Sequence, residues 1–202
     1  MTNIPITPLA TLIVAALASQ AHASQNEVMV ITASGFQQKI EDSAASISVV
    51  TREQLEKRAY RDVTDALKDV PGVVITGGGS SSDISIRGMG AKYTLMLVDG
   101  KRVDSRGTRP NSDGPGIEQG WLPPLQAIER IEVVRGPMSS RYGSDAMGGV
   151  INIITRKVSK EWGGEVSVGA GIPQDSEWGN QYKSSFYING PIKQDLLGLA
   201  VR

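Results

Sequence analysis

Two β-branched apolar runs with a short polar break between them constrain the fold of this chain more than any other feature. The first run spans residues 131–134 and ends at Gly136-Pro137, and the second spans residues 150–154 after Gly148-Gly149. Short β-branched runs bounded by glycine and proline predict strands. The break at 139–145 is too polar for the core and is bounded by glycines that disfavour a long helix. We therefore expect two buried strands with a polar interruption.

Composition excludes several classes of function. The chain has 202 residues, with 21 basic and 21 acidic side chains and no cysteine. Disulfides and thiolate metal sites are therefore impossible, and the zero net charge gives no support for nucleic-acid binding. The only histidine is His22, which falls in a predicted leader, so histidine-dependent catalysis and most transition-metal sites are not expected. We find neither an activated nucleophile nor a spaced carboxylate pair, and predict that the protein is not an enzyme.

Residues 1–23 have the pattern of a secretory signal peptide. An apolar centre runs from Leu9 to Ala18, and Ala21-His22-Ala23 forms a small-x-small cleavage site. The apolar centre is about half the length that a spanning helix needs, which makes a membrane anchor the weaker interpretation. The first eight residues depart from the pattern because they contain no lysine or arginine.

The segment at 24–42 contains a short extended stretch at 28–31 between polar flanks. It is either an ordinary edge strand, which the pattern alone favours, or a strand that pairs with the sheet edge of a partner.

A strand at 47–50 is followed by a capping box, in which Thr51 is the N-cap and Gln54 reaches back to it. A second helix begins near Asp62, where apolar residues at i, i+3, i+4 and i+7 form one face, and Pro71-Gly72 ends it.

The middle of the chain alternates short strands with glycine-rich connections. Strands are predicted at 73–75, 83–87 and 94–98, and Asp99-Gly100 predicts a hairpin that returns through Lys101-Arg102-Val103. Residues 77–82 are predicted to be a flexible loop. A phosphate cradle there is disfavoured because the P-loop pattern and a following helix N-terminus are both missing. A short helix is expected from Pro124 to Ile128.

The segment at 104–120 is glycine- and proline-rich and has no apolar periodicity, so it is either disordered or functional. Arg106 and Arg109 within it are consistent with an anion site and equally with solvated loop arginines. Beyond Lys160 the composition changes to alternating apolar and polar residues at 165–170, 182–189 and 196–201, with Gly190-Pro191 expected to end the second run. This pattern suits either an outer-membrane β-barrel or a soluble meander.

Four segments carry a resemblance to a known family: ISIRGMG at 84–90, LVDGKRV at 97–103, IERIEVVRGP at 128–137 and RGPMSSRYGSDAMGGVINIITR at 135–156. They resemble the plug motifs of TonB-dependent outer-membrane receptors. The segment at 109–123 and the Tyr-Gly-Ser-Asp motif at Tyr142 are most similar to the catecholate-siderophore branch, which includes enterobactin-type receptors and the colicin I receptor. The resemblance covers residues 27–202.

The resemblance implies an α+β plug domain with a small mixed β-sheet and short helices, followed by the first strands of a transmembrane β-barrel. The implied divisions are a signal peptide at 1–23, a TonB box and linker at 24–42, the plug at 43–158 and barrel strands at 159–202. Only about three spanning strands fit into 160–202, whereas the smallest closed barrel needs eight, so an N-terminal fragment is expected. The alternative function is a non-transporting fragment, or a free plug module that binds siderophore or TonB.

The resemblance also implies partners and site residues. The TonB box would comprise Glu27, Val28, Met29, Val30, Ile31, Thr32 and Ala33, with Val28 where close relatives usually carry threonine. A ferric catecholate siderophore would be the ligand, with iron held by the ligand's own oxygens and no cofactor bound by protein side chains. Lys101, Arg106 and Arg109 are the candidate ligand contacts, and residues 77–82 are a second candidate ligand loop.

Arg87 and Arg135 match plug arginines that pair with glutamates of the barrel wall, and pairing within the plug to Glu129 or Glu132 is the alternative. The expected location is the bacterial outer membrane. Colicins are further implied partners, and no nucleic acid is expected.

Overall fold

A computed structural model describes residues 29–30, 32, 35–36, 38–43, 45–58, 60–78, 81–103, 116–171, 180–194 and 196–201 of the chain. The predicted signal peptide at 1–23 lies outside the described residues, as do Glu27, Val28, Ile31, Ala33, Arg106 and Arg109. Among the helices that are described, none has the length and apolar character needed to cross a membrane.

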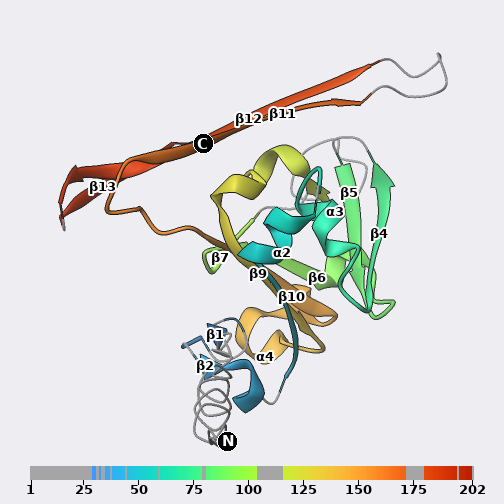
Figure 1. Cartoon of the computed structure of the whole chain (residues 1–202). Helices are drawn as coiled ribbons and strands as arrows, with labels where there is room; N and C mark the ends of the chain where they lie inside the picture. Colours follow the sequence, from blue (N-terminus) through green and yellow to red (C-terminus); the bar gives the residue numbers. More distant parts are fainter. Residues whose placement is uncertain are drawn as a thin grey trace, which may run out of the picture.

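The centre of the molecule is a five-stranded mixed sheet in the order β3-β9-β10-β6-β7 (Figure 1). The strands are β3 (Ser46–Thr51), β6 (Thr94–Val98), β7 (Lys101–Arg102), β9 (Ile128–Arg135) and β10 (Gly149–Thr155). Strands β6 and β10 are parallel and the other neighbours are antiparallel. The two predicted apolar runs are β9 and β10, and both are buried as expected.

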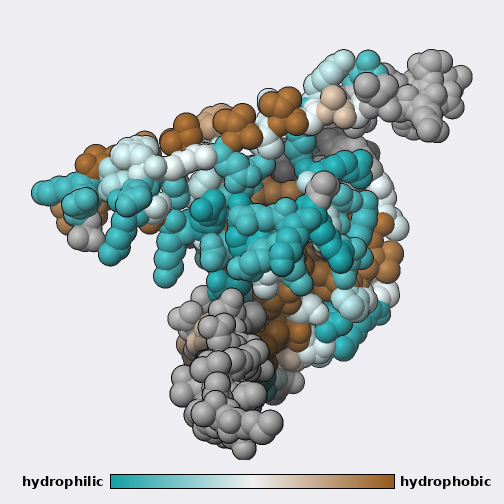
Figure 2. All heavy atoms as spheres, viewed as in Figure 1, coloured by the Kyte–Doolittle hydropathy of each residue, from teal (hydrophilic) through white to brown (hydrophobic). Residues whose placement is uncertain are grey.

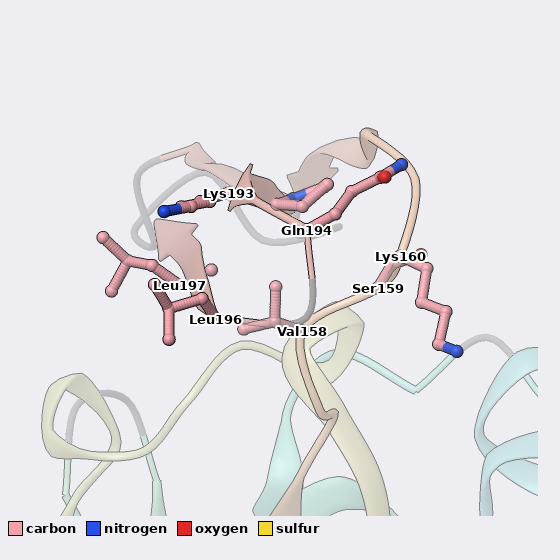
Figure 3. Close-up of a pocket in the computed structure, with 9 residues that line it drawn as sticks. Val158, Ser159, Lys160, Lys193, Gln194, Leu196 and Leu197 are labelled. Carbon is pink, nitrogen blue, oxygen red and sulfur yellow. The ribbon is translucent and has the colours of Figure 1, made fainter.

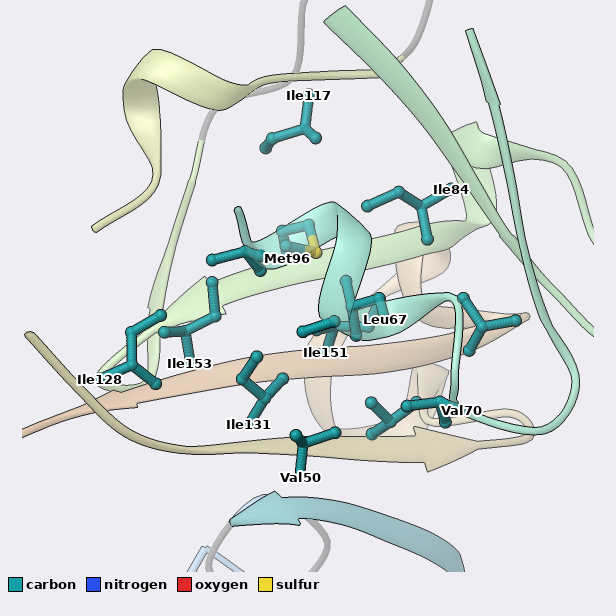
Figure 4. Packing of buried hydrophobic residues seen from close by; sticks show 14 of the residues in the cluster. Val50, Leu67, Val70, Ile84, Met96, Ile117, Ile128, Ile131, Ile151 and Ile153 are labelled. Carbon is teal, nitrogen blue, oxygen red and sulfur yellow. The ribbon is translucent and has the colours of Figure 1, made fainter. Parts of the chain in front are cut away.

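Two short helices cover one face of this sheet and close the main core. Helix α2 (Arg52–Lys57) begins at the predicted capping box, with the Gln54 N–H donating to Thr51 Oγ1 and the Thr51 N–H donating to Gln54 Oε1. Helix α3 (Val63–Leu67) places Leu67 over the sheet beside Ile151, and the following Val70 belongs to the same buried cluster (Figure 4). Apolar contacts between these helices and β9 and β10 therefore form the core.

A second sheet of three antiparallel strands, β4-β5-β8, flanks the helices. Strand β4 (Val73–Gly78) pairs with β5 (Ser81–Ile86), which pairs with β8 (Ile117–Glu118). The prediction of a loop at 77–82 was therefore wrong in extent, because Gly77 and Gly78 continue β4 and Ser81 and Ser82 begin β5. Cross-strand pairing extends the strands through residues whose intrinsic preference is for turns.

The connections contain several single-turn helices. They are η1 (Ile40–Asp42), η2 (Ala91–Tyr93), η4 (Gln119–Trp121), η5 (Leu125–Ala127), α4 (Ser139–Tyr142) and η6 (Ser144–Ala146). The polar break between β9 and β10 is thus formed by α4 and η6. The turn expected after Pro124 is the 3-10 helix η5. Together with the mixed sheet, these elements show the expected α+β arrangement of a small mixed sheet and short helices.

The last part of the chain forms a separate antiparallel sheet, β11-β12-β13. Its strands are β11 (Gly163–Gly171), β12 (Gln181–Lys193) and β13 (Leu197–Val201). The expectation that Gly190-Pro191 ends the second strand was wrong, because β12 continues to Lys193. A register shift between Pro191 and Lys193 accommodates the proline, which cannot donate to the ladder.

Candidate functional site

The extended N-terminal stretch forms a small hairpin below the central sheet. Strand β1 (Met29–Val30) pairs with β2 (Gln38–Lys39) through only two residue pairs, Met29 with Lys39 and Val30 with Gln38. Gly35 lies between them with a positive φ of 80°, and a β-carbon at this position would collide with the guanidinium of Arg141 on α4. The hairpin therefore lies against α4, and Val30 is fully buried there.

Thr32, two residues beyond Val30, is attached to the central sheet and to α4 through all of its polar groups. Its N–H and Oγ1 both donate to Oε2 of Glu132, at 2.8 and 2.6 Å. Asn152 Nδ2 donates to Thr32 Oγ1 at 3.0 Å, and the Tyr142 hydroxyl donates to the Thr32 carbonyl at 2.9 Å. Thr32 is only 1% exposed. We call Glu132, Asn152 and Tyr142 the Thr32 socket.

Each member of the Thr32 socket has a further partner that fixes its position. Glu132 is fully buried, and its Oε1 accepts from Arg130 Nε at 2.8 Å. Asn152 is the cross-strand neighbour of Glu132, and its Oδ1 accepts from the Gly100 N–H at 3.2 Å. A buried carboxylate is stable only with such donors, because its desolvation is otherwise uncompensated. The β9–β10 pair and the β6–β7 turn thus hold two of the three members.

The third member, Tyr142, is held through Arg102 on β7. Arg102 donates to the Tyr142 carbonyl, and its Nη1 lies 2.8 Å from Oδ2 of Asp145 on η6. The hydrogen bond from Arg102 lowers the pKa of Asp145, with a smaller contribution from Ser144, against the raising effect of burial. This ion pair connects β7 to the α4–η6 segment that carries the Tyr142 hydroxyl.

Arg87 and Arg135 come together at the end of β9. A β-carbon placed on Gly72 would lie 3.7 Å from Cγ of Arg87 and 3.8 Å from Cδ of Arg135. Arg135 Nη1 donates to the carbonyl of Pro71 at 3.0 Å, whereas its buried Nε has no hydrogen-bond partner among the described residues. Glu132, one of the two alternative partners within the plug, accepts hydrogen bonds from Thr32 and Arg130.

The candidate ligand contacts are only partly placed. Lys101 lies on β7 directly after the Asp99-Gly100 turn and is exposed. Arg106 and Arg109 lie outside the described residues, but the end of their segment is fixed because β8 pairs with β5 at Ser81 and Ser82. The structure therefore brings together the two segments that were candidate ligand loops, 77–82 and the end of 104–120.

The β11–β12 hairpin has two unlike faces. Glu165, Ser167 and Ser185 share one face, which is turned toward the central unit, where Ser185 donates to Gln126 at 3.2 Å and Glu165 pairs with Arg52 at 3.1 Å. The opposite face carries exposed apolar side chains, among them Val168 at 82% exposure and Tyr182 at 78%. Figure 2 shows hydrophobic residues along these strands on the side away from the central unit.

A hollow of about 400 Å³ lies where residues 158–160 pass beneath the turn between β12 and β13 (Figure 3). Residues 191, 193, 194 and 196–198 form its other wall. No group of three or more histidine, cysteine, aspartate or glutamate side chains suited to a metal ion occurs in the part of the chain that the structure describes.

Comparison with known proteins identifies this arrangement. The family model of the TonB-dependent Receptor Plug Domain matches residues 39–150, which is more than half of the chain. The chain belongs to the family of TonB-dependent receptors. Members of this family are outer-membrane receptors that act as transporters, not as enzymes. The sheet of β3, β6, β7, β9 and β10, with its two helices, is therefore the plug fold.

The plug and the strands after it are similar to proteins of known identity. The chain is 63% identical over 176 residues to the iron-regulated outer membrane virulence protein of Vibrio cholerae, covering 87% of the chain and 27% of that protein. The siderophore receptor PirA of Acinetobacter baumannii superposes with a TM-score of 0.65 at 42% identity, covering 76% of this chain and 23% of that one.

A variant of the ferric enterobactin receptor of Pseudomonas aeruginosa, solved in complex with enterobactin, superposes with a TM-score of 0.60 at 40% identity. The match covers 75% of this chain and 23% of that one. The chain thus spans about a quarter of the length of these relatives and corresponds to their N-terminal portion.

The Thr32 socket within the plug was not found from the sequence, although a signal for it exists. Glu132 and Asn152 are the polar residues inside the two apolar runs that define β9 and β10. Buried polar residues in such runs require partners. Thr32 lies 100 residues from Glu132, and nothing in either segment alone indicates that they meet.

Proposed function

We propose that this chain supplies the plug, the TonB-binding segment and the first wall strands of a receptor that imports a ferric catecholate siderophore across the outer membrane. The match of the plug family to residues 39–150, directly after a short docked strand, carries this proposal. Similarity to receptors whose names specify iron regulation, siderophore or enterobactin supports the ligand class.

Residues Glu27 to Ala33 are proposed to add a strand to the sheet of TonB. The described part of this segment includes β1, an extended strand whose ladder with β2 has only two residue pairs, so an incoming strand would displace few hydrogen bonds of that ladder. A Met29→Pro change removes one backbone donor and disfavours extended pairing. Transport of ferric siderophore should fall to background while siderophore binding is retained, and Met29→Leu should transport normally. Unimpaired transport by Met29→Pro would place the TonB segment elsewhere.

The siderophore is proposed to bind at the end of the plug formed by 77–82 and 104–120. A ferric catecholate is anionic, so cationic side chains are the chemistry that would recognise it. Lys101, Arg106 and Arg109 are the candidates, and the pairing of β8 with β5 supports a common site for the two segments.

In a full-length receptor that carries this chain as its N-terminal portion, the double change of Arg106 and Arg109 to alanine should weaken ferric-siderophore binding at least tenfold. Arg61→Ala, at an exposed site on the plug, is the matched control.

Arg87 and Arg135 are proposed to pair with carboxylates of the barrel wall. The support is the convergence of the two side chains at Gly72 and the buried Nε of Arg135, which no described residue satisfies. A buried guanidinium donor is costly unless it is paired.

Strands β11, β12 and β13 are proposed to begin the barrel wall. Strand β11 has nine residues, which suits a tilted spanning strand, and the hairpin has one polar face toward the plug and one exposed apolar face. That combination is what a strand between a plug and lipid requires.

A further inference from the structure

The Thr32 socket is a preformed binding site for one residue of the N-terminal segment. Its members come from three elements, β9, β10 and α4, and each is fixed by a partner other than Thr32: Arg130 for Glu132, the Gly100 N–H for Asn152, and Arg102 for Tyr142. Arg130 and the Gly100 N–H bind the side chains of Glu132 and Asn152, whereas Arg102 binds the backbone carbonyl of Tyr142, and none of these contacts depends on Thr32. Docking of Thr32 therefore requires little reorganisation of the plug.

The socket contributes more to docking than the β1–β2 ladder does. The ladder has two residue pairs, and an isolated hairpin of this size is marginal in water. Thr32 instead makes four hydrogen bonds in a buried environment, and two of them go to one carboxylate oxygen. Bonds to a buried charge are the stronger ones, and their loss leaves that charge incompletely solvated. The cost of withdrawing Thr32 from the socket thus opposes exposure of the segment.

We infer that insertion of Thr32 into the Glu132–Asn152–Tyr142 socket sets the equilibrium between a docked and an exposed N-terminal segment, with Glu132 as the principal positioning residue. The consequence for TonB rests on the proposed function of residues 27–33. A partner that pairs with β1 would then bind with an affinity reduced by the docked fraction, and the socket chemistry would determine that fraction.

The absence of cysteine from the chain allows a direct test. Val30 is fully buried when the segment is docked, so a single Val30→Cys reporter should react with N-ethylmaleimide only from the exposed state. The reporter would be the only cysteine of a full-length receptor that carries this chain as its N-terminal portion, with any cysteine of the remaining sequence replaced by serine, in isolated outer membranes without TonB. The rate of labelling then measures the exposed population when opening and closing are fast relative to the reaction.

Thr32→Val is the decisive variant because it is close in shape and removes only the hydroxyl. One donor to Glu132 and the acceptor for Asn152 are lost, and labelling should become about tenfold faster. Thr32→Ser keeps both bonds and should label at the original rate within about twofold. Equal rates for valine and threonine at position 32 would overturn the inference.

Tyr142→Phe provides an independent variant, because it removes only the bond to the Thr32 carbonyl and should accelerate labelling by a smaller factor. An Ile151→Cys reporter in the buried core distinguishes local undocking from unfolding of the plug, and its labelling should not change. Acceleration at both reporters would overturn the inference in favour of a general structural role. The labelling assay does not use TonB. Normal transport by Met29→Pro would therefore refute the proposed TonB-binding role of residues 27–33 without changing the labelling rates expected here.

Discussion

Arg52 and Glu165 connect helix α2 of the plug to strand β11, with Arg52 Nη2 3.1 Å from Glu165 Oε2. The same guanidinium donates through Nη1 to the carbonyls of Leu125 and Ile128, at 2.9 and 3.3 Å. Arg52 is therefore bound mainly to the backbone that leads into β9, and the contact with the strand hairpin is an addition to that role. This connection lies within the chain, unlike the wall contacts proposed for Arg87 and Arg135.

The first prediction concerns the unequal contributions of Arg52 and Glu165 to stability. Arg52→Ala should lower the free energy of unfolding of the 202-residue chain by about 2–3 kcal/mol, because several bonds to a largely buried charged group are lost. Glu165→Gln should lower it by less than about 1 kcal/mol, since the carboxylate is half exposed. Urea denaturation in mild detergent, followed by tryptophan fluorescence, would measure both. Equal losses of unfolding free energy for Arg52→Ala and Glu165→Gln would contradict the assignment of Arg52 mainly to the backbone contacts.

Local sequence signals predicted the short-range features of the plug. The capping box at Thr51 and the Asp99-Gly100 turn depend on residues within three positions of each other, and both are present. The apolar runs predicted β9 and β10 because β-branched residues bury well in a sheet. The Gly77–Gly78 part of β4 was missed, since only pairing with β5 makes it a strand.

Long-range polar contacts could not be predicted from the same signals. Glu132 is one of the two alternative partners that the sequence offers to Arg87 and Arg135 within the plug, because a buried guanidinium needs a partner, but successive side chains of a strand alternate between faces. Glu132 lies on the face that meets Thr32, and Arg135, three residues later, donates to Pro71. The assignment of partners depends on how the N-terminal segment folds back, which no local pattern records.

A second prediction uses the buried Nε of Arg135. In the 202-residue chain, Arg135→Met should change the free energy of unfolding by less than about 1 kcal/mol, because the charged group lacks a full set of partners. In a full-length receptor that carries this chain, the same change should cost about 3 kcal/mol, because it would break a buried pair with the wall. Urea denaturation of both proteins measures the difference. Similar small effects in the two contexts would show that Arg135 has no partner in the wall, and Arg61→Met is the exposed control.

A third prediction concerns pH and the Arg102–Asp145 pair. The hydrogen bond from Arg102 lowers the pKa of Asp145 below its ordinary value of 3.8. A carboxylate with a depressed folded pKa stabilises the fold above the unfolded pKa and loses this contribution as pH falls through the folded value. The stability difference between the unaltered chain and Asp145→Asn should be constant from about pH 5 to pH 7 and should shrink below pH 3.8.

Urea denaturation as a function of pH measures this difference. Arg102→Gln should remove most of the pH-dependent part, because the cation that depresses the pKa is gone. A difference that grew as the solution became more acidic would contradict the assigned direction of the shift.

The last prediction tests the apolar face of the hairpin as a lipid contact. Val168 is 82% exposed on this face, near the middle of β11, whereas Ser167 beside it points to the other face. An arginine at a lipid-facing position near the bilayer centre costs about 2–4 kcal/mol. In a full-length receptor that carries this chain, Val168→Arg should therefore sharply reduce the amount recovered in the outer membrane, as measured by fractionation and immunoblotting. Glu161→Arg introduces the same side chain at an exposed position before the strand and should be recovered normally. Normal recovery of Val168→Arg would mean that this face meets water or another protein, which favours a soluble meander over a wall strand.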